Sequence, residues 1–173
     1  VFPTASTIKS AILYEVYRQV DEGTIDLGSR IEFKQSDIVE GSGVLRDIAP
    51  GLQPTVHDLA MLMIIVSDNT ATNMLIDLVG GPEPVNATMA SIGLTNTTLY
   101  RKINFTLKVT DPQWLATSSP FDLMQLAALI AKALPFDLFE TRRLVGAAVG
   151  IAGMLIVWRL ARRLGGPAAG LIA

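Results

Sequence analysis

Apolar residues recur every four positions near the start of the chain. Ile8, Ile12, Val16 and Val20 would form one continuous apolar stripe on an α-helix. This spacing predicts a helix over residues 6 to about 22, followed by a glycine that ends it. Polar positions between the apolar ones are predicted to face solvent. They are Glu15, Arg18, Gln19 and Glu22.

Four further helices are predicted from apolar residues three and four positions apart and from residues that favour helix ends. Thr55 and Asp58 have the spacing of a capping box at the start of one helix. Thr70 is the predicted N-cap of the next, and Ser119 followed by Pro120 opens the last one. The predicted ranges are 55–66, 71–78, 84–91 and a segment that begins at residue 119.

Two segments between the first two helices lack a helical period. Residues 31–33 alternate between apolar and charged side chains, which predicts a short strand. Residues 37–53 contain four glycines or prolines and predict a loop with at most one short strand. Gly41-Ser42-Gly43 in this loop is interpreted as a glycine turn, although it could also border a pocket. His57 is interpreted as a surface residue in the first turn of a helix rather than as a general base.

Composition and charge narrow the class of protein. The length of 173 residues suits one domain, and 50% hydrophobic with 17% charged residues excludes a disordered chain. The net charge of −2 argues against a nucleic-acid partner. The chain has no cysteine and one histidine, so we expect no disulfide, no thiolate chemistry and no histidine-rich metal site. No cofactor is predicted.

The composition of the chain changes near residue 140, where an apolar run flanked by arginines follows. We expect residues 1–140 to form the folded unit and residues 141–173 to form a separate apolar segment. Residues 144–158 carry no charge, and arginines flank them on both sides. These 15 residues are fewer than the about 20 that cross a bilayer as a helix. Three interpretations remain open: a helix that contacts a membrane, a helix buried in a core, and a tail foreign to the fold.

Ser6 and Lys9 are three positions apart at the start of the first predicted helix, so their side chains share one helical face. The lysine can accept the serine's proton if burial or a neighbouring cation lowers its pKa. The helix N-terminus would also present a backbone N–H to a developing oxyanion. The spacing alone suits equally well an N-cap serine beside a solvated lysine, so it does not by itself indicate an enzyme.

A second motif, Ser67-Asp68-Asn69, lies at a tight break between two predicted helices. S-x-x-K followed by S-D-N is the motif pair of class A β-lactamases and penicillin-binding proteins. The chain resembles this family over roughly residues 1–135. Matching residues around the motifs are Phe2-Pro3-Thr4-Ala5, Gly41-Ser42-Gly43, the run from Leu59 to Ile64, and Gly80-Gly81.

The resemblance implies an α-rich chain. It would be mainly the all-helical lobe of the α/β β-lactamase/transpeptidase-like fold, with most of the antiparallel sheet absent from a truncated sequence. It also implies a serine hydrolase that acts on β-lactam amides through an acyl-serine intermediate. Ser6 would be the nucleophile, Lys9 its general base, and Ser67 the relay of a proton to the leaving nitrogen. Asn69 would contact the substrate amide and Lys9. Asp68 would be structural, and no metal would take part.

The substrate implied by the resemblance is a small β-lactam or a peptide that ends in D-alanine. The family works outside the cytoplasm, in the periplasm or secreted, although no signal peptide precedes Ser6 in this sequence. The apolar residues 144–158 leave contact with a membrane open.

The sequence departs from the family at two places. The resemblance puts the glutamate that activates the deacylating water at Ile103, and its asparagine partner at Leu107. Asp111 could replace that glutamate, but it is interpreted as part of an Asp-Pro turn. No K-[ST]-G motif occurs in the sequence. We therefore expect slow deacylation. The alternatives are a D-alanyl-D-alanine carboxypeptidase or penicillin-binding-like acyl-enzyme, and a non-catalytic truncated binding module.

Overall fold

A computed structural model describes residues 1–105 and 113–133 of the chain. The α-helices of this part are α1 (Lys9–Asp21), α2 (Val56–Ile65), α3 (Asn69–Leu78), α4 (Pro82–Ser91) and α5 (Pro120–Ala133). The strands are β1 (Phe2–Pro3), β2 (Thr98–Leu99) and β3 (Ala116–Ser118). Short 3₁₀ turns cover Ala5–Ile8, Gln35–Asp37 and Leu45–Asp47. This largely helical composition confirms the predicted α-rich class.

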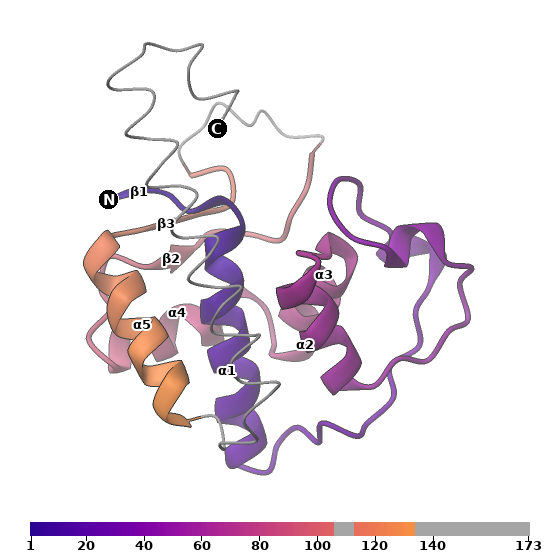
Figure 1. The fold of residues 1–173 in the computed structure, drawn as a ribbon, viewed down its shortest axis with the longest axis horizontal. Helices are drawn as coiled ribbons and strands as arrows, with labels where there is room; N and C mark the ends of the chain where they lie inside the picture. Colours follow the sequence, from indigo (N-terminus) through magenta and orange to yellow (C-terminus); the bar gives the residue numbers. More distant parts are fainter. Residues whose placement is uncertain (106–112, 134–173) are drawn as a thin grey trace.

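Helix α1 lies at the centre of the fold. It contacts α2, α3, α4 and α5, with α4 and α5 on one side and α2 and α3 on the other (Figure 1). Ile8, Ile12 and Val16 are all at most 1% exposed, which confirms the predicted apolar stripe. The core of the described chain therefore forms around the helix that begins at Lys9.

A small antiparallel sheet lies at the N-terminal end of α1 (Figure 1). Its strand order is β1-β3-β2, with Phe2 opposite Ser118 and Leu99 opposite Ala116. The ladder continues past β1, because the Thr4 N–H donates to the Ala116 carbonyl at 3.0 Å. The sheet thus holds the segment that leads directly into the turn with Ser6.

Two predicted helix starts are confirmed in detail. The Thr55 hydroxyl accepts from the Asp58 N–H at 3.0 Å, and the Asp58 carboxylate accepts from the Thr55 N–H at 2.9 Å. This pair is the capping box expected for α2. At α5 the Ser119 hydroxyl accepts from the Asp122 N–H at 3.1 Å.

The predicted start of α3 is wrong. Asp68, not Thr70, is the N-cap, because its Oδ1 accepts from the Ala71 N–H at 2.9 Å. The Thr70 hydroxyl instead bonds to the backbone of Val39 in the preceding loop. Helix α4 begins at Pro82 rather than near residue 84, since a proline suits the first helical position.

The short strand predicted over residues 31–33 is also wrong. Ile31 and Phe33 do donate backbone hydrogen bonds, each at 2.9 Å, to the carbonyls of Pro54 and Leu52. Pro54 has no N–H to return, and the pairing is reduced to an isolated bridge between Arg30 and Thr55. Residues 37–53 form the predicted loop, with a 3₁₀ turn and no strand.

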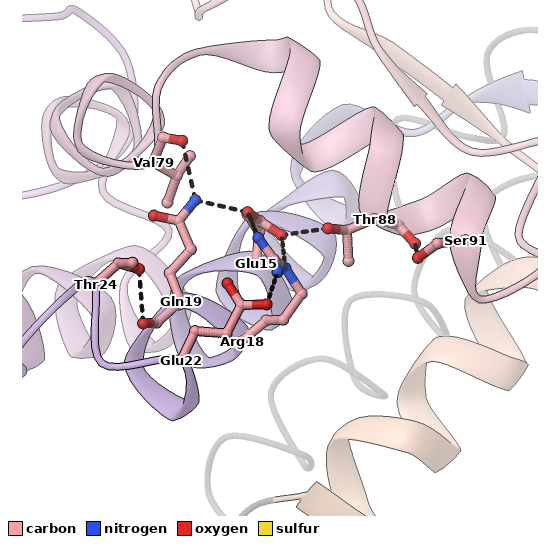
Figure 2. A network of polar contacts seen from close by, with 8 residues as sticks. All are labelled: Glu15, Arg18, Gln19, Glu22, Thr24, Val79, Thr88 and Ser91. Carbon is pink, nitrogen blue, oxygen red and sulfur yellow. Dashed lines mark hydrogen bonds and ion pairs between the residues drawn. The ribbon is translucent and has the colours of Figure 1, made fainter.

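Glu15 was predicted to face solvent, and this is wrong because its side chain is fully buried. Arg18 donates to both carboxylate oxygens at 2.8 Å, and Gln19 donates to Oε1 at 2.6 Å. The Thr88 hydroxyl of α4 donates to Oε2 at 2.6 Å (Figure 2). The carboxylate therefore joins α1 to α4.

These contacts also set the protonation of Glu15. Burial by itself raises the pKa of this carboxyl group, but the hydrogen bonds from Arg18, Thr88 and Gln19 outweigh burial and lower the pKa below its ordinary value. The charged form is therefore the one that the fold stabilises.

The predicted C-terminal segment 141–173, with its apolar run 144–158, lies outside the described residues. Within residues 1–105 and 113–133, no helix has the length and apolar character needed to cross a membrane.

We predict that Glu15→Gln destabilises the protein by about 1–3 kcal/mol at pH 7, because Arg18 loses a charged partner and Thr88 an acceptor. The pKa of Glu15 is lowered by folding, so its contribution is complete above the ordinary carboxyl pKa of about 4.3 and disappears as the pH falls further. Urea unfolding from pH 7 to pH 3 should show the two proteins converging.

The matched control is Glu22→Gln, which removes the other carboxylate that pairs with Arg18. The Glu22 side chain is 54% exposed, so the expected cost is below about 1 kcal/mol. Equal losses in the two variants would contradict the role assigned to Glu15.

Candidate active site

Lys9 begins α1, and its side chain points into the protein. The residue is 2% exposed. Its Nζ donates to the Ser67 carbonyl at 2.7 Å, to the Ser67 hydroxyl at 2.9 Å and to Asn69 Oδ1 at 3.0 Å. An ammonium group has three N–H donors, so these bonds account for all of them. The structure thus joins the two sequence motifs through one buried cation.

Burial lowers the pKa of Lys9 from 10.5 to about 8, although the negative charge of Asp68 opposes the shift. The neutral amine is therefore accessible near neutral pH. It would keep two N–H donors for Ser67 and Asn69 and gain a free lone pair.

The backbone of Ser67 explains how one residue offers two acceptors to Lys9. Its φ of +55° lies in the left-handed region, which residues other than glycine seldom adopt. Ser67 follows the C-cap of α2 at Val66 and precedes Asp68, the N-cap of α3. In this sharp break both the carbonyl and the hydroxyl of Ser67 point to the same ammonium.

Asp68 is buried, with 1% of its surface exposed, and its carboxylate holds the break between α2 and α3 in place. One carboxylate oxygen accepts from the Ala71 N–H at the start of α3. The other accepts from the N–H groups of Val44 at 2.6 Å and Leu45 at 2.9 Å. The Asp68 side chain therefore joins the start of α3 to the loop that contains Gly41 and Gly43.

Three hydrogen bonds fix the position of Asn69. Its Oδ1 accepts from Lys9, its Nδ2 donates to the Glu40 carbonyl at 2.9 Å, and its backbone N–H donates to the Ser42 carbonyl at 2.9 Å. A carboxamide has two N–H donors, and among the described residues one of those of Nδ2 is used by the Glu40 carbonyl, which leaves the other for a further partner.

Ser6 lies one turn before Lys9, within the 3₁₀ turn Ala5–Ile8. The sheet anchors the segment before it, and the preceding Ala5 has a φ of +47°, so the chain turns sharply from β1 into the helix. The Ser6 side chain is half-buried. The structure brings Lys9, Ser67 and Asn69 into direct contact, and it places Ser6 on the adjoining turn.

The main chain at Ile103 is fixed by a residue that the sequence reasoning missed. Asn73 donates to the Ile103 carbonyl and accepts from the Ile103 N–H, both at 2.9 Å. The Ile103 side chain is 5% exposed. Asn73 is four positions after Asn69 and so on the same face of α3, which was the available signal. Leu107 and Asp111 lie outside the described residues.

Two further expectations concern the histidine and metal ions. His57 is half-buried in the first turn of α2. Among the described residues, no group of three or more histidine, cysteine, aspartate or glutamate side chains could hold a metal ion.

Comparison with known proteins identifies the family of the chain. Residues 1–138 match the Beta-lactamase enzyme family, and the chain belongs to this family. β-Lactamase L2 of Stenotrophomonas maltophilia is 40% identical over 92 residues, which are 53% of this chain and 30% of that protein.

Solved structures show the same relationship. A β-lactamase from Sphaerobacter thermophilus superposes with a TM-score of 0.69 and 35% identity, covering 89% of this chain and 55% of that one. A point mutant of PBP-A, solved as an acyl-enzyme complex with penicillin G, gives a TM-score of 0.65 at 35% identity, over 84% of this chain and 53% of that one. The chain thus spans about half the length of these solved relatives and less of the curated one.

We predict that Gly43→Ala destabilises the protein strongly. A Cβ at Gly43 would lie 2.3 Å from Cγ of Asp68 and 2.6 Å from its Cα, at a φ of +118°. The matched control is Gly51→Ala, where φ is +98° and nothing lies within 4 Å. The control should lose about 1–2 kcal/mol from backbone strain, and Gly43→Ala at least about 2 kcal/mol more. Urea denaturation measures both, and equal losses would contradict the tight approach of Asp68.

Proposed function

We propose that this chain carries the acylating centre of a serine enzyme that attacks β-lactam amides. The observation that supports the proposal is the buried Lys9, whose lowered pKa and contacts with Ser67 and Asn69 unite the two motifs. A relative with the same fold is described as an acyl-enzyme complex with penicillin G. We extend the proposal to an extracytoplasmic location, where such compounds are met.

The proposed acylation begins with Lys9 as the neutral amine. Its lone pair takes the proton of Ser6, and the Ser6 oxygen attacks the amide carbonyl. Backbone N–H groups at the start of the helix stabilise the oxyanion. As the C–N bond breaks, the proton passes from Lys9 to Ser67 and from Ser67 to the leaving nitrogen. The 2.9 Å contact between Lys9 Nζ and Ser67 Oγ supports this route.

Asn69 and Asp68 have supporting roles in the proposal. The spare N–H of Asn69 binds the substrate amide while its oxygen orients Lys9. Asp68 holds the break between α2 and α3 in place, so that Ser67 keeps its position.

A second candidate function is favoured by one observation at Ile103. An apolar, buried side chain stands where the resemblance requires the base for deacylation. Such a site would hold its acyl group, as a penicillin-binding protein or a D-alanyl-D-alanine carboxypeptidase-like acyl-enzyme does.

The first test concerns the nucleophile and its base, in a fusion that adds the remaining strands of the Sphaerobacter thermophilus relative. Ser6→Ala should abolish covalent labelling by a fluorescent penicillin, and Lys9→Ala should slow it by about 10²–10⁴-fold. Because the base is neutral lysine, labelling should accelerate with pH and reach half its maximum near pH 8. Ser10→Ala, one helical turn along, is the control that should label normally. Undiminished labelling of Ser6→Ala would sink the assignment.

The second test concerns turnover by the same fusion. Intact-mass spectrometry after brief exposure to benzylpenicillin should show a persistent adduct, because the isoleucine at position 103 cannot activate water. Ile103→Glu should shorten the lifetime of the adduct at least about tenfold, since Asn73 already fixes the main chain there.

Ile103→Gln is the control for this second test, with similar size but no basic group, and its adduct should persist. Rapid multiple turnover by the unmodified protein would contradict slow deacylation and would make Asp111 the first residue to test as the missing base.

A further inference from the structure

The loop over residues 37–53 is bound by three consecutive residues at the start of α3. Asp68 accepts from the backbone N–H groups at positions 44 and 45. Asn69 donates to the carbonyls at positions 42 and 40. Thr70 bonds to the backbone at position 39. Each step forward along α3 is thus matched by a step back along the loop, and the two segments are joined at successive points.

Thr70 makes the last of these contacts. It is 1% exposed, and its hydroxyl accepts from the Val39 N–H at 3.0 Å. The same hydroxyl donates to the Val39 carbonyl at 3.4 Å, since a hydroxyl can donate and accept at once. One buried side chain therefore holds both polar backbone groups of the residue that precedes Glu40.

The carboxamide of Asn69 lies tightly against the same loop. Its Nδ2 donates to the Glu40 carbonyl at 2.9 Å. A Cβ on the next residue, Gly41, would lie 2.7 Å from that nitrogen, so there is no room for even a methyl group between the loop and the carboxamide. A change in the path of the loop at Val39 would therefore move the Glu40 carbonyl and the Asn69 amide with it.

We propose that Thr70 is a positioning residue for acylation, which acts on Asn69 through Val39 and Glu40. This inference rests on the proposed function, in which Asn69 orients Lys9 and binds the substrate amide. A carboxamide is planar, so the direction of one N–H fixes the other N–H and the oxygen. By holding the Glu40 carbonyl, Thr70 keeps Oδ1 on Lys9 and directs the second N–H of Nδ2 to the substrate.

The first experiment measures acylation of the fusion described above by benzylpenicillin, which carries a side-chain amide, and by 6-aminopenicillanic acid, which carries an amine. Thr70→Val keeps the size of the side chain and removes its hydroxyl. It should lower the ratio of the two acylation rates by about 3- to 10-fold, whereas Thr70→Ser should keep the ratio within about twofold. Thr70→Ala should change the ratio in the same direction, and it replaces Thr70→Val if a thermal melt shows that valine prevents folding.

The matched control is Thr72→Val. Thr72 is also buried on α3, but its hydroxyl donates to the Asp68 carbonyl, one turn back on the same helix, and not to the loop. The loss of a buried hydroxyl from α3 is therefore common to both variants, and only Thr70→Val should change the ratio.

A double-mutant cycle shows whether Thr70 acts through Asn69. Asn69→Ala removes the carboxamide and should itself lower the ratio. Adding Thr70→Val to Asn69→Ala should then change the ratio by less than about twofold. An equal fall with and without the carboxamide overturns the positioning role, and so does an unchanged ratio in Thr70→Val.

The second experiment observes the carboxamide without chemistry, in the full chain with Ser6→Ala. The two Nδ2 protons of Asn69 give a pair of ¹⁵N-correlated NMR signals, which Asn69→Ala identifies by their loss. Thr70→Val should shift or broaden this pair, while Thr70→Ser and Thr72→Val should leave it unchanged. A pair that is the same in Thr70→Val overturns the role of Thr70.

The outcomes separate this inference from the proposed function. Labelling of Ser6 with an unchanged ratio in Thr70→Val overturns the role of Thr70 and leaves the proposed function intact. A fusion that folds but does not label on Ser6 overturns the proposed function, and the Asn69 signals then still show whether Thr70 holds the carboxamide.

Discussion

The structure depends on a buried ammonium group that is surrounded by neutral oxygens. Lys9 joins segments that lie 58 positions apart, and burying its charge without these acceptors would be costly. The acceptors face it because Asp68 holds the helix break that positions them. The oxygens make the burial of Lys9 tolerable, and that burial, opposed by the negative charge of Asp68, lowers its pKa to about 8.

The sequence predicted those features whose cause is local. The apolar period of α1 and the caps at Thr55 and Ser119 depend on neighbouring residues, and the structure confirms them. Glu15 could not be placed in this way, because Thr88, which helps to bury it, lies 73 positions away. The juxtaposition of Lys9 with Ser67 was available only through the resemblance of two short motifs, since their spacing carries no geometric information.

At position 103 the path of the backbone does not depend on the identity of the side chain. Asn73 binds the backbone of that residue on both sides, and these bonds do not depend on the side chain. The peptide can therefore hold the same path whether the residue is isoleucine or a carboxylate. In the function that we propose, a substitution at this position would change how long an acyl group persists and would leave the helical scaffold unchanged.

The register of the small sheet has a consequence for the order of assembly. Thr4 bonds to Ala116 across 112 positions of chain, so the contact closes a long loop and lowers the chain entropy accordingly. During synthesis on the ribosome, α1 to α4 can pack against one another before residue 116 emerges from the exit tunnel. The turn that holds Ser6, close to the first described residue, is then fixed by one of the last described segments to be made.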